Sequence, residues 1–136
     1  MLNENGILPI GLNVNSSQQV TIQNTVISSN SFSGIFINGS IWNLNILNCS
    51  LMSNEVGIYV SGETNANITY NSIAYNEIGV LYYHVSHASS INYNDIYNNT
   101  LAMQSVNSTI PINATHNYWG DKSGPVSYTH LTLPTN

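Results

Sequence analysis

Few side chains in this sequence could take part in acid-base catalysis. The chain has six acidic residues, one lysine and no arginine, and its only aspartates are Asp95 and Asp121. Hydrolysis of a glycosidic bond usually requires a pair of carboxyl groups that flank the scissile bond. We therefore predict no catalytic residue in this chain. The alternative is a polysaccharide lyase, hydrolase or epimerase whose active site lies on turns outside it.

Two pairs of side chains could instead hold a metal ion. Glu55 and Glu77 each follow an asparagine and lie 22 residues apart, so a calcium ion could lie between them. Calcium takes about six to eight oxygen ligands, and two carboxylates supply too few. His84 and His87, in the segment YYHVSH, could bind copper or zinc, but this pair lacks a third protein ligand. We therefore predict no cofactor, with calcium as the alternative.

Aromatic and large apolar side chains recur at a similar spacing and are the candidate ligand-binding residues. They form two sets, Phe36, Tyr59 and Leu81 in the first and Tyr70, Tyr93 and His116 in the second. Exposed rings suit the faces of sugars or a partner surface, and a contiguous exposed apolar patch commonly marks an interaction site. The alternative is that the rings only stabilise neighbouring strands as cross-strand pairs.

These spacings belong to a repeat of about 23 residues. Glycine and asparagine return with the same period in three columns: Gly11, Gly34, Gly57, Gly79 and then Ala102; Asn24, Asn48, Asn71, Asn94 and Asn117; and Asn30, Asn54, Asn76 and Asn99. Asparagine tolerates the left-handed backbone conformation of tight bends, and stacked asparagine side chains can hydrogen-bond along a column. The repeat therefore predicts short segments joined by tight turns and stacked on one another.

Each repeat is typical of short strands, because apolar residues alternate with other residues over only three to five positions, as in Val20/Ile22 and Leu44/Ile46. No stretch has a convincing helical period. We predict an all-β, single-stranded, right-handed parallel β-helix (β-solenoid) of about five turns of 22–24 residues. The expected inward columns are Ile35/Ile58/Val80/Met103 and Ile27/Leu51/Ile73/Ile96, the second ending at Trp119.

The composition excludes some partners. The formal net charge is −5 with a single basic side chain, Lys122, whereas binding to nucleic acid depends on Lys and Arg that neutralise phosphates. Anionic membranes are disfavoured for the same reason, and no segment is long and apolar enough for membrane insertion. We therefore expect neither nucleic acid nor a membrane as a partner.

The two ends of the sequence suggest how the domain is bounded. A recognisable turn begins almost at once, so we expect residues 1–125 to be a β-helix fragment truncated at its N-terminus. The last eleven residues, VSYTHLTLPTN, lack the repeat and resemble read-through of a synthetic sequencing adapter. We therefore expect residues 126–136 to be a non-native tail.

The segment NATHNYWGDKSGP, residues 113–125, closely resembles the ending of right-handed β-helix repeat modules of bacterial and archaeal surface and secreted proteins. Earlier turns such as NSIAYNEIGV resemble repeats of the same family, which includes pectate-lyase-like and NosD-like groups. The resemblance implies export to the periplasm, cell surface or medium. Pectate-lyase-like catalysis would need an Asp and Glu cluster for calcium beside an Arg or Lys base, and this chain has no Arg.

The function that the sequence favours is a non-catalytic β-solenoid segment of an exported or cell-surface protein. Its side-chain columns would bind a polysaccharide or a partner surface. A purely structural spacer is the other alternative to the enzyme fragment described above.

Overall fold

The computed structural model describes residues 10–15, 19–120 and 131–132, and these residues form strands and turns only. Three parallel sheets run along the molecule. The first contains β1 (Ile10–Asn15), β4 (Ser33–Asn38), β7 (Val56–Ser61), β10 (Ile78–Tyr83) and β13 (Leu101–Val106). The second contains β2 (Gln19–Gln23), β5 (Ile41–Leu47), β8 (Thr64–Thr69), β11 (Ser90–Asn92), β14 (Ile112–Asn113) and β15 (Leu131–Thr132). The third contains β3 (Val26–Ser28), β6 (Ser50–Met52), β9 (Ser72–Ala74) and β12 (Asp95–Tyr97).

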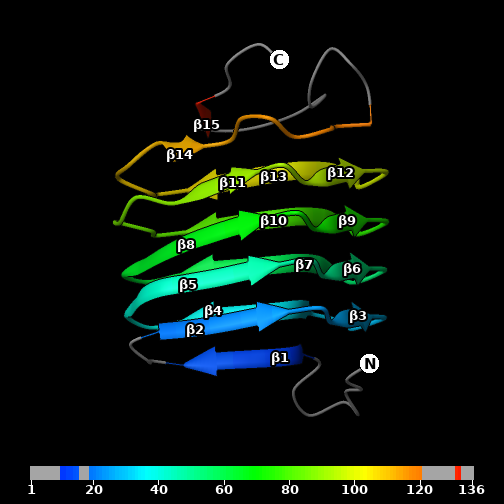
Figure 1. Ribbon diagram of the computed structural model, residues 1–136, viewed down its shortest axis with the longest axis horizontal. Helices are drawn as coiled ribbons and strands as arrows, with labels where there is room; N and C mark the ends of the chain where they lie inside the picture. Colours follow the sequence, from blue (N-terminus) through cyan, green and yellow to red (C-terminus); the bar gives the residue numbers. More distant parts are fainter. Residues whose placement is uncertain (1–9, 16–18, 121–130, 133–136) are drawn as a thin grey trace.

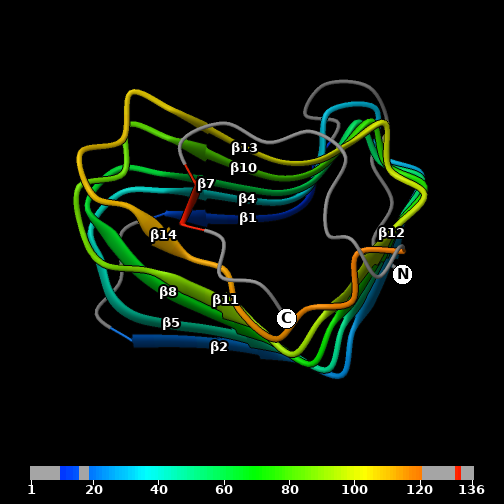
Figure 2. The same ribbon diagram turned by 90° about the horizontal axis from the view of Figure 1, so that it is seen from above.

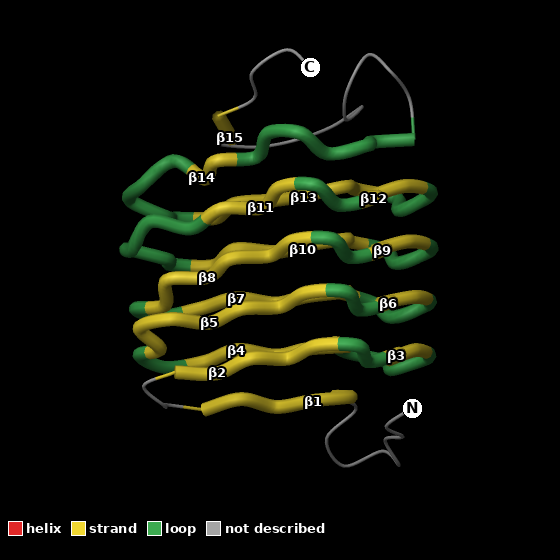
Figure 3. The backbone as a smooth tube through the Cα atoms, viewed as in Figure 1, coloured by secondary structure: helices red, strands yellow, loops and turns green. Residues whose placement is uncertain are grey.

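The chain visits the three sheets in turn and rises by one strand layer per circuit, which makes a right-handed parallel β-solenoid (Figures 1 and 2). The predicted fold is therefore confirmed. The described residues hold four complete three-strand turns, followed by β13 and β14 of a fifth, so the expected five turns were a slight overcount. Strands and tight turns alternate at the same places in each layer (Figure 3). No helix in the described part of the chain could span a bilayer.

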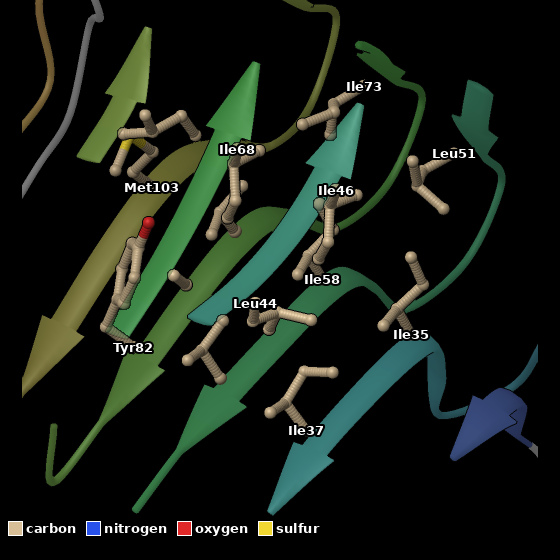
Figure 4. Close-up of a cluster of buried hydrophobic side chains, with 14 of the residues drawn as sticks. Ile35, Ile37, Leu44, Ile46, Leu51, Ile58, Ile68, Ile73, Tyr82 and Met103 are labelled. Carbon is tan, nitrogen blue, oxygen red and sulfur yellow. The ribbon is translucent and has the colours of Figure 1, made fainter. Parts of the chain in front are cut away.

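The apolar core fills the interior of the solenoid, and both predicted inward columns are confirmed. Each of their eight members is fully buried, in register with its neighbours on adjacent turns. Trp119 ends the second column with only 8% of its surface exposed. Isoleucine, leucine and valine from facing sheets meet across the interior (Figure 4). No single turn could bury these side chains, so each turn depends on its neighbours for stability.

A column of asparagines joins the turns at the corner between the third and first sheets. The backbone N–H and side-chain amide of Asn54 both donate to Asn76 Oδ1, at 2.9 and 3.2 Å. Asn30 donates in the same way to Asn54, and Asn76 to Asn99. The column is buried apart from its last member, so water cannot easily replace these hydrogen bonds.

The glycine column exists because the backbone passes close to these amides. A β-carbon on Gly57 would lie 2.6 Å from the carbonyl oxygen of Gly79 and 3.1 Å from Asn76 Nδ2. Ala102 is the last member of this column and lies on β13, the last strand of the first sheet among the described residues.

The first predicted asparagine column was wrong at its start. In the structure, Asn71 accepts a hydrogen bond from the backbone N–H of Cys49, at 2.9 Å, and not from Asn48. Asn48 instead continues the column of Asn24, to which its side chain donates at 2.7 Å. The buried column is therefore Cys49, Asn71, Asn94 and Asn117.

A β-bulge in β5 explains the error. Ile41 pairs with Thr64, 23 residues later, but Leu44 pairs with Ala66, 22 residues later. The extra residue in β5 shifts every later position of that turn by one relative to the next turn. A constant step of 23 or 24 therefore assigned Asn48 to the wrong column.

Tyr82 is the only fully buried tyrosine among the described residues, and it gives a pH-dependent prediction. Tyr82 is fully buried, its hydroxyl points toward Met103 (Figure 4), and among the described residues it has no hydrogen-bond partner. Burial raises the pKa of Tyr82 far above its ordinary value. In the unfolded chain this hydroxyl ionises near pH 10, so the unfolded state alone loses the proton above that pH. We expect the free energy of unfolding to be independent of this group below about pH 10 and to fall as pH rises further.

The substitution Tyr82→Phe tests this expectation. It removes an unpaired buried hydroxyl and should leave stability at pH 7 unchanged or slightly increased, by up to about 1 kcal/mol. Urea unfolding at pH 7 and at pH 11 should show a smaller alkaline loss for the variant than for the original chain. An equal alkaline loss in both proteins would contradict the assignment to Tyr82.

Candidate binding surfaces

A stack of rings lies at the corner between the second and third sheets. The Tyr70 and Tyr93 ring centroids are 5.5 Å apart with an interplanar angle of 14°, and the Tyr93 and His116 centroids are 5.1 Å apart with an angle of 17°. Tyr70 and Tyr93 are 62% and 52% exposed. Tyr70, Tyr93 and His116 therefore form an exposed stack of rings.

The backbone conformation at this corner does not favour tyrosine. Tyr70, Tyr93 and His116 have φ values of 57°, 59° and 58°, in the left-handed region, and so do Asn24 and Asn48 in the same column. This conformation costs most L-residues about 1–2 kcal/mol and is easiest for glycine and asparagine. Stacked rings offset part of that cost, by about 0.5–1.5 kcal/mol per pair. Backbone geometry alone therefore favours asparagine here, and the tyrosines add a surface that asparagine lacks.

An open groove of about 590 Å³ runs beside this stack and crosses several turns. Its walls come from the same three consecutive positions at the corner of successive turns. The lining residues are Asn24, Thr25, Val26, Asn48, Cys49, Ser50, Tyr70, Asn71, Ser72, Tyr93 and Asp95. One face of the Tyr70 ring is covered by Tyr93, so its other face is directed toward Asn48 on the preceding turn.

The groove is polar but nearly uncharged. Asp95 is its only ionisable carboxyl group, and amides and hydroxyls supply most of its other polar atoms. Cys49 also borders it, but its side chain is buried and its thiol hydrogen-bonds to Leu47 O at 3.4 Å. Burial raises the pKa of the Cys49 thiol, and its hydrogen bonds lower that pKa by a smaller amount. A protonated thiol is a weak nucleophile and a poor metal ligand, so the groove can bind a ligand through hydrogen bonds and a ring face.

The first set of predicted binding residues is less accessible than expected. Phe36, Tyr59 and Leu81 lie in register on the outer face of the first sheet, but each is only partly exposed. Phe32 packs against both aromatic members, with centroid distances of 5.7 and 5.6 Å. Burial raises the pKa of Tyr59, with a smaller contribution from Tyr83. Phe36 and Tyr59 therefore form an aromatic cluster with Phe32, and Leu81 lies beside Tyr59 on the next turn.

The candidate metal ligands do not form a cluster of three. Glu55 and Glu77 are exposed and adjacent on neighbouring turns, where the Ile78 N–H donates to Glu55 O. His84 and His87 are both exposed. His84 Nε2 lies 3.4 Å from the Asn107 side chain, and its ring lies 4.1 Å from that of Tyr83. Within the described ranges, no group of three or more His, Cys, Asp or Glu side chains could hold a metal ion.

Sequence reasoning missed the hydroxyl residues that line the groove. Thr25, Ser50 and Ser72 flank the corner on successive turns. Ser50 and Ser72 occupy the same position of the repeat, and Thr25 lies one position earlier. Small polar residues are common throughout this sequence, so these three did not stand out. Lys122 and the predicted tail boundary at residue 126 lie outside the described residues.

Comparison with known proteins identifies the family. The profile of the periplasmic copper-binding protein (NosD) family matches residues 2–130, which is most of the chain. No curated protein and no solved structure matches. The family is periplasmic, in agreement with the expected export to the periplasm or cell surface. On the profile match and the parallel β-solenoid, the chain belongs to the periplasmic copper-binding protein (NosD) family.

Proposed function

We propose that this exported β-solenoid binds an uncharged polysaccharide along the groove beside Tyr70 and Tyr93. The observation that carries the proposal is the groove of about 590 Å³ with an exposed tyrosine stack on its wall. Sugars present apolar ring faces and many hydroxyl groups. An aromatic face and rows of amide and hydroxyl groups match both features.

The charge of the groove supports an uncharged polymer over an acidic one. The groove has no cationic side chain among its lining residues, and Asp95 would repel uronic acid or sulfate groups. Equivalent positions recur on each turn, about 4.8 Å from the previous ones. A polymer lying along the solenoid could therefore contact several turns at once.

The groove favours binding over cleavage. Glycoside hydrolysis generally requires two carboxyl groups, and Asp95 is the only one that lines the groove. We therefore propose a binding segment, in which Asp95 accepts hydrogen bonds from sugar hydroxyls.

Copper binding, which the family description names, does not fit the described residues of this chain. Copper sites are built from imidazole, thiolate and thioether ligands that converge on one point. The His116 ring stacks on Tyr93, the His84 ring lies against Tyr83, and the Cys49 thiol is buried and protonated. These groups belong to different environments, so no step of the proposed function depends on copper.

A glycan array with the intact chain tests the proposal. It should carry neutral glucans, mannans, galactans and chitin oligosaccharides, with polygalacturonate as the acidic comparison. We expect saturable binding to a neutral polymer. For the best oligosaccharide, Tyr70→Ala should weaken the affinity about tenfold, which is the loss expected for one ring contact.

Tyr75→Ala is the matched control. Tyr75 is also exposed and also has a positive φ, 59°, but it does not line the groove. Tyr75→Ala should leave the affinity unchanged. This result would show that the loss in Tyr70→Ala comes from the missing ring contact and not from a change in the backbone. Absence of glycan binding, or an equal loss in both variants, would overturn the proposal and favour a structural spacer. Release of shortened oligosaccharides would favour an enzyme.

A further inference from the structure

A second pocket lies at the corner between the first and second sheets. The turns that form this corner are at the left of Figure 2. We propose that this pocket binds a small organic ammonium ion, up to the size of one amino sugar. The pocket has a volume of about 240 Å³ and is lined by Ser40, Ile41, Trp42, Glu63, Asn65 and His87. This proposal does not depend on the tyrosine groove.

The β-bulge in β5 creates the pocket. Ile41 and Leu44 are both fully buried, although strict alternation would place residues three apart on opposite faces. The extra residue between their pairs with Thr64 and Ala66 resolves this conflict and turns Trp42 outward. Alternation counted from Leu44 and Ile46 would place Trp42 inward, and the bulge instead lets Trp42 follow buried Ile41 and point outward.

The result is an unusually exposed tryptophan. The Trp42 side chain is 80% exposed, more than any other large hydrophobic residue in the described part of the chain. An indole in this position adds little to core packing. Bulges commonly redirect a side chain at a binding site, and here the redirected side chain forms a wall of the pocket.

The chemistry of the pocket favours a cation. The Glu63 carboxylate lies on the next turn and accepts a hydrogen bond from Ser40 Oγ at 3.3 Å, which helps to orient it. The lining contains no Lys or Arg that could neutralise this carboxylate. An ammonium group can lie against the face of an indole while it donates a hydrogen bond to a carboxylate.

His87 completes the lining of the pocket. It lies in the loop between β10 and β11, on the following turn, and its Nδ1 is 3.3 Å from Ser86 Oγ. Glu63 and His87 are the titratable side chains that line the pocket. The imidazole of His87 offers a further polar contact to a bound ligand.

Calorimetry and tryptophan fluorescence on the full chain test the proposal. The probes are glucosamine, the uncharged analogue N-acetylglucosamine, and tetramethylammonium. Trp42 is exposed and Trp119 is buried, so a ligand-induced blue shift should report on Trp42. We expect saturable binding of glucosamine and tetramethylammonium and at least tenfold weaker binding of N-acetylglucosamine.

Two pairs of variants separate the site from general charge effects. Glu63→Gln should weaken glucosamine binding about tenfold, while Glu55→Gln, which removes a carboxylate on another corner, should not change it. Trp42→Leu should abolish the fluorescence shift and weaken binding in calorimetry, while Tyr70→Ala should not. Equal binding of N-acetylglucosamine, or an equal effect of the two glutamate variants, would overturn the proposal. Tyr70→Ala changes only the tyrosine groove, so a failure of the ammonium-binding proposal can be distinguished from a failure of the polysaccharide proposal.

Discussion

Replacing Trp119 by alanine should lower the free energy of unfolding by about 3–5 kcal/mol, the cost of truncating a large aromatic residue in a core. Trp119 ends the column that begins with Ile27, and it is 8% exposed. Backbone hydrogen bonds such as Ile96 N–H to Tyr118 O, at 2.7 Å, join the turn that carries it to the preceding turn. The large indole adds apolar packing that holds this turn on the core.

Urea unfolding would measure the overall loss, and hydrogen exchange would locate it. In a solenoid each turn contacts only its neighbours, so the amide of Ile96 should lose protection before that of Ile58 in β7. Trp42→Ala is the control, because it removes the same side chain from a site that is 80% exposed. It should change stability by no more than about 0.5 kcal/mol. Equal stability of the two variants would show that Trp119 does not hold the last turn.

The fold was predictable because each turn of a solenoid repeats the same pattern of residues, which appears in the sequence as a period. One inward position recurs at nearly constant steps, as Ile35, Ile58, Val80 and Met103. If each step is one turn, the strands that carry these residues must stack on one another. The error at Asn48 has the same origin. A bulge adds a residue without changing composition, and both Asn48 and Asn71 are asparagines, so the period alone could not show the shift.

The candidate sites were less predictable than the fold. The Tyr70 and Tyr93 stack follows from spacing, since equal positions on adjacent turns must be neighbours. The partial burial of Phe36 depends on Phe32, which lies outside the repeat column and packs across it. Trp42 gave no signal, because only the bulge decides that it points outward. The sequence period was therefore enough to predict which side chains are neighbours. Predicting which of them are exposed required the three-dimensional register.

Replacing Asn76 by alanine should lower the free energy of unfolding by about 2–4 kcal/mol. Its side chain accepts hydrogen bonds from the N–H and the amide of Asn54, and its own amide donates to Leu51 O and Asn99 Oδ1, both at 3.0 Å. Each of these bonds contributes about 0.5–1.5 kcal/mol net, and the buried donors of Asn54 would lose their acceptor.

The matched control is Asn13→Ala, which removes the same amide from an exposed position on β1. Urea unfolding should show almost no change for this control and a clear loss for Asn76→Ala. Hydrogen exchange should also show faster exchange at the amide of Asn54, because its acceptor is gone. If the two variants were equally stable, the turns would be held together by the apolar core and backbone pairing, and the asparagine column would only shape the corner. A loss confined to Asn76→Ala would instead mean that this corner stabilises the solenoid through side-chain hydrogen bonds, which would explain why Gly57 must leave room for the amide of Asn76.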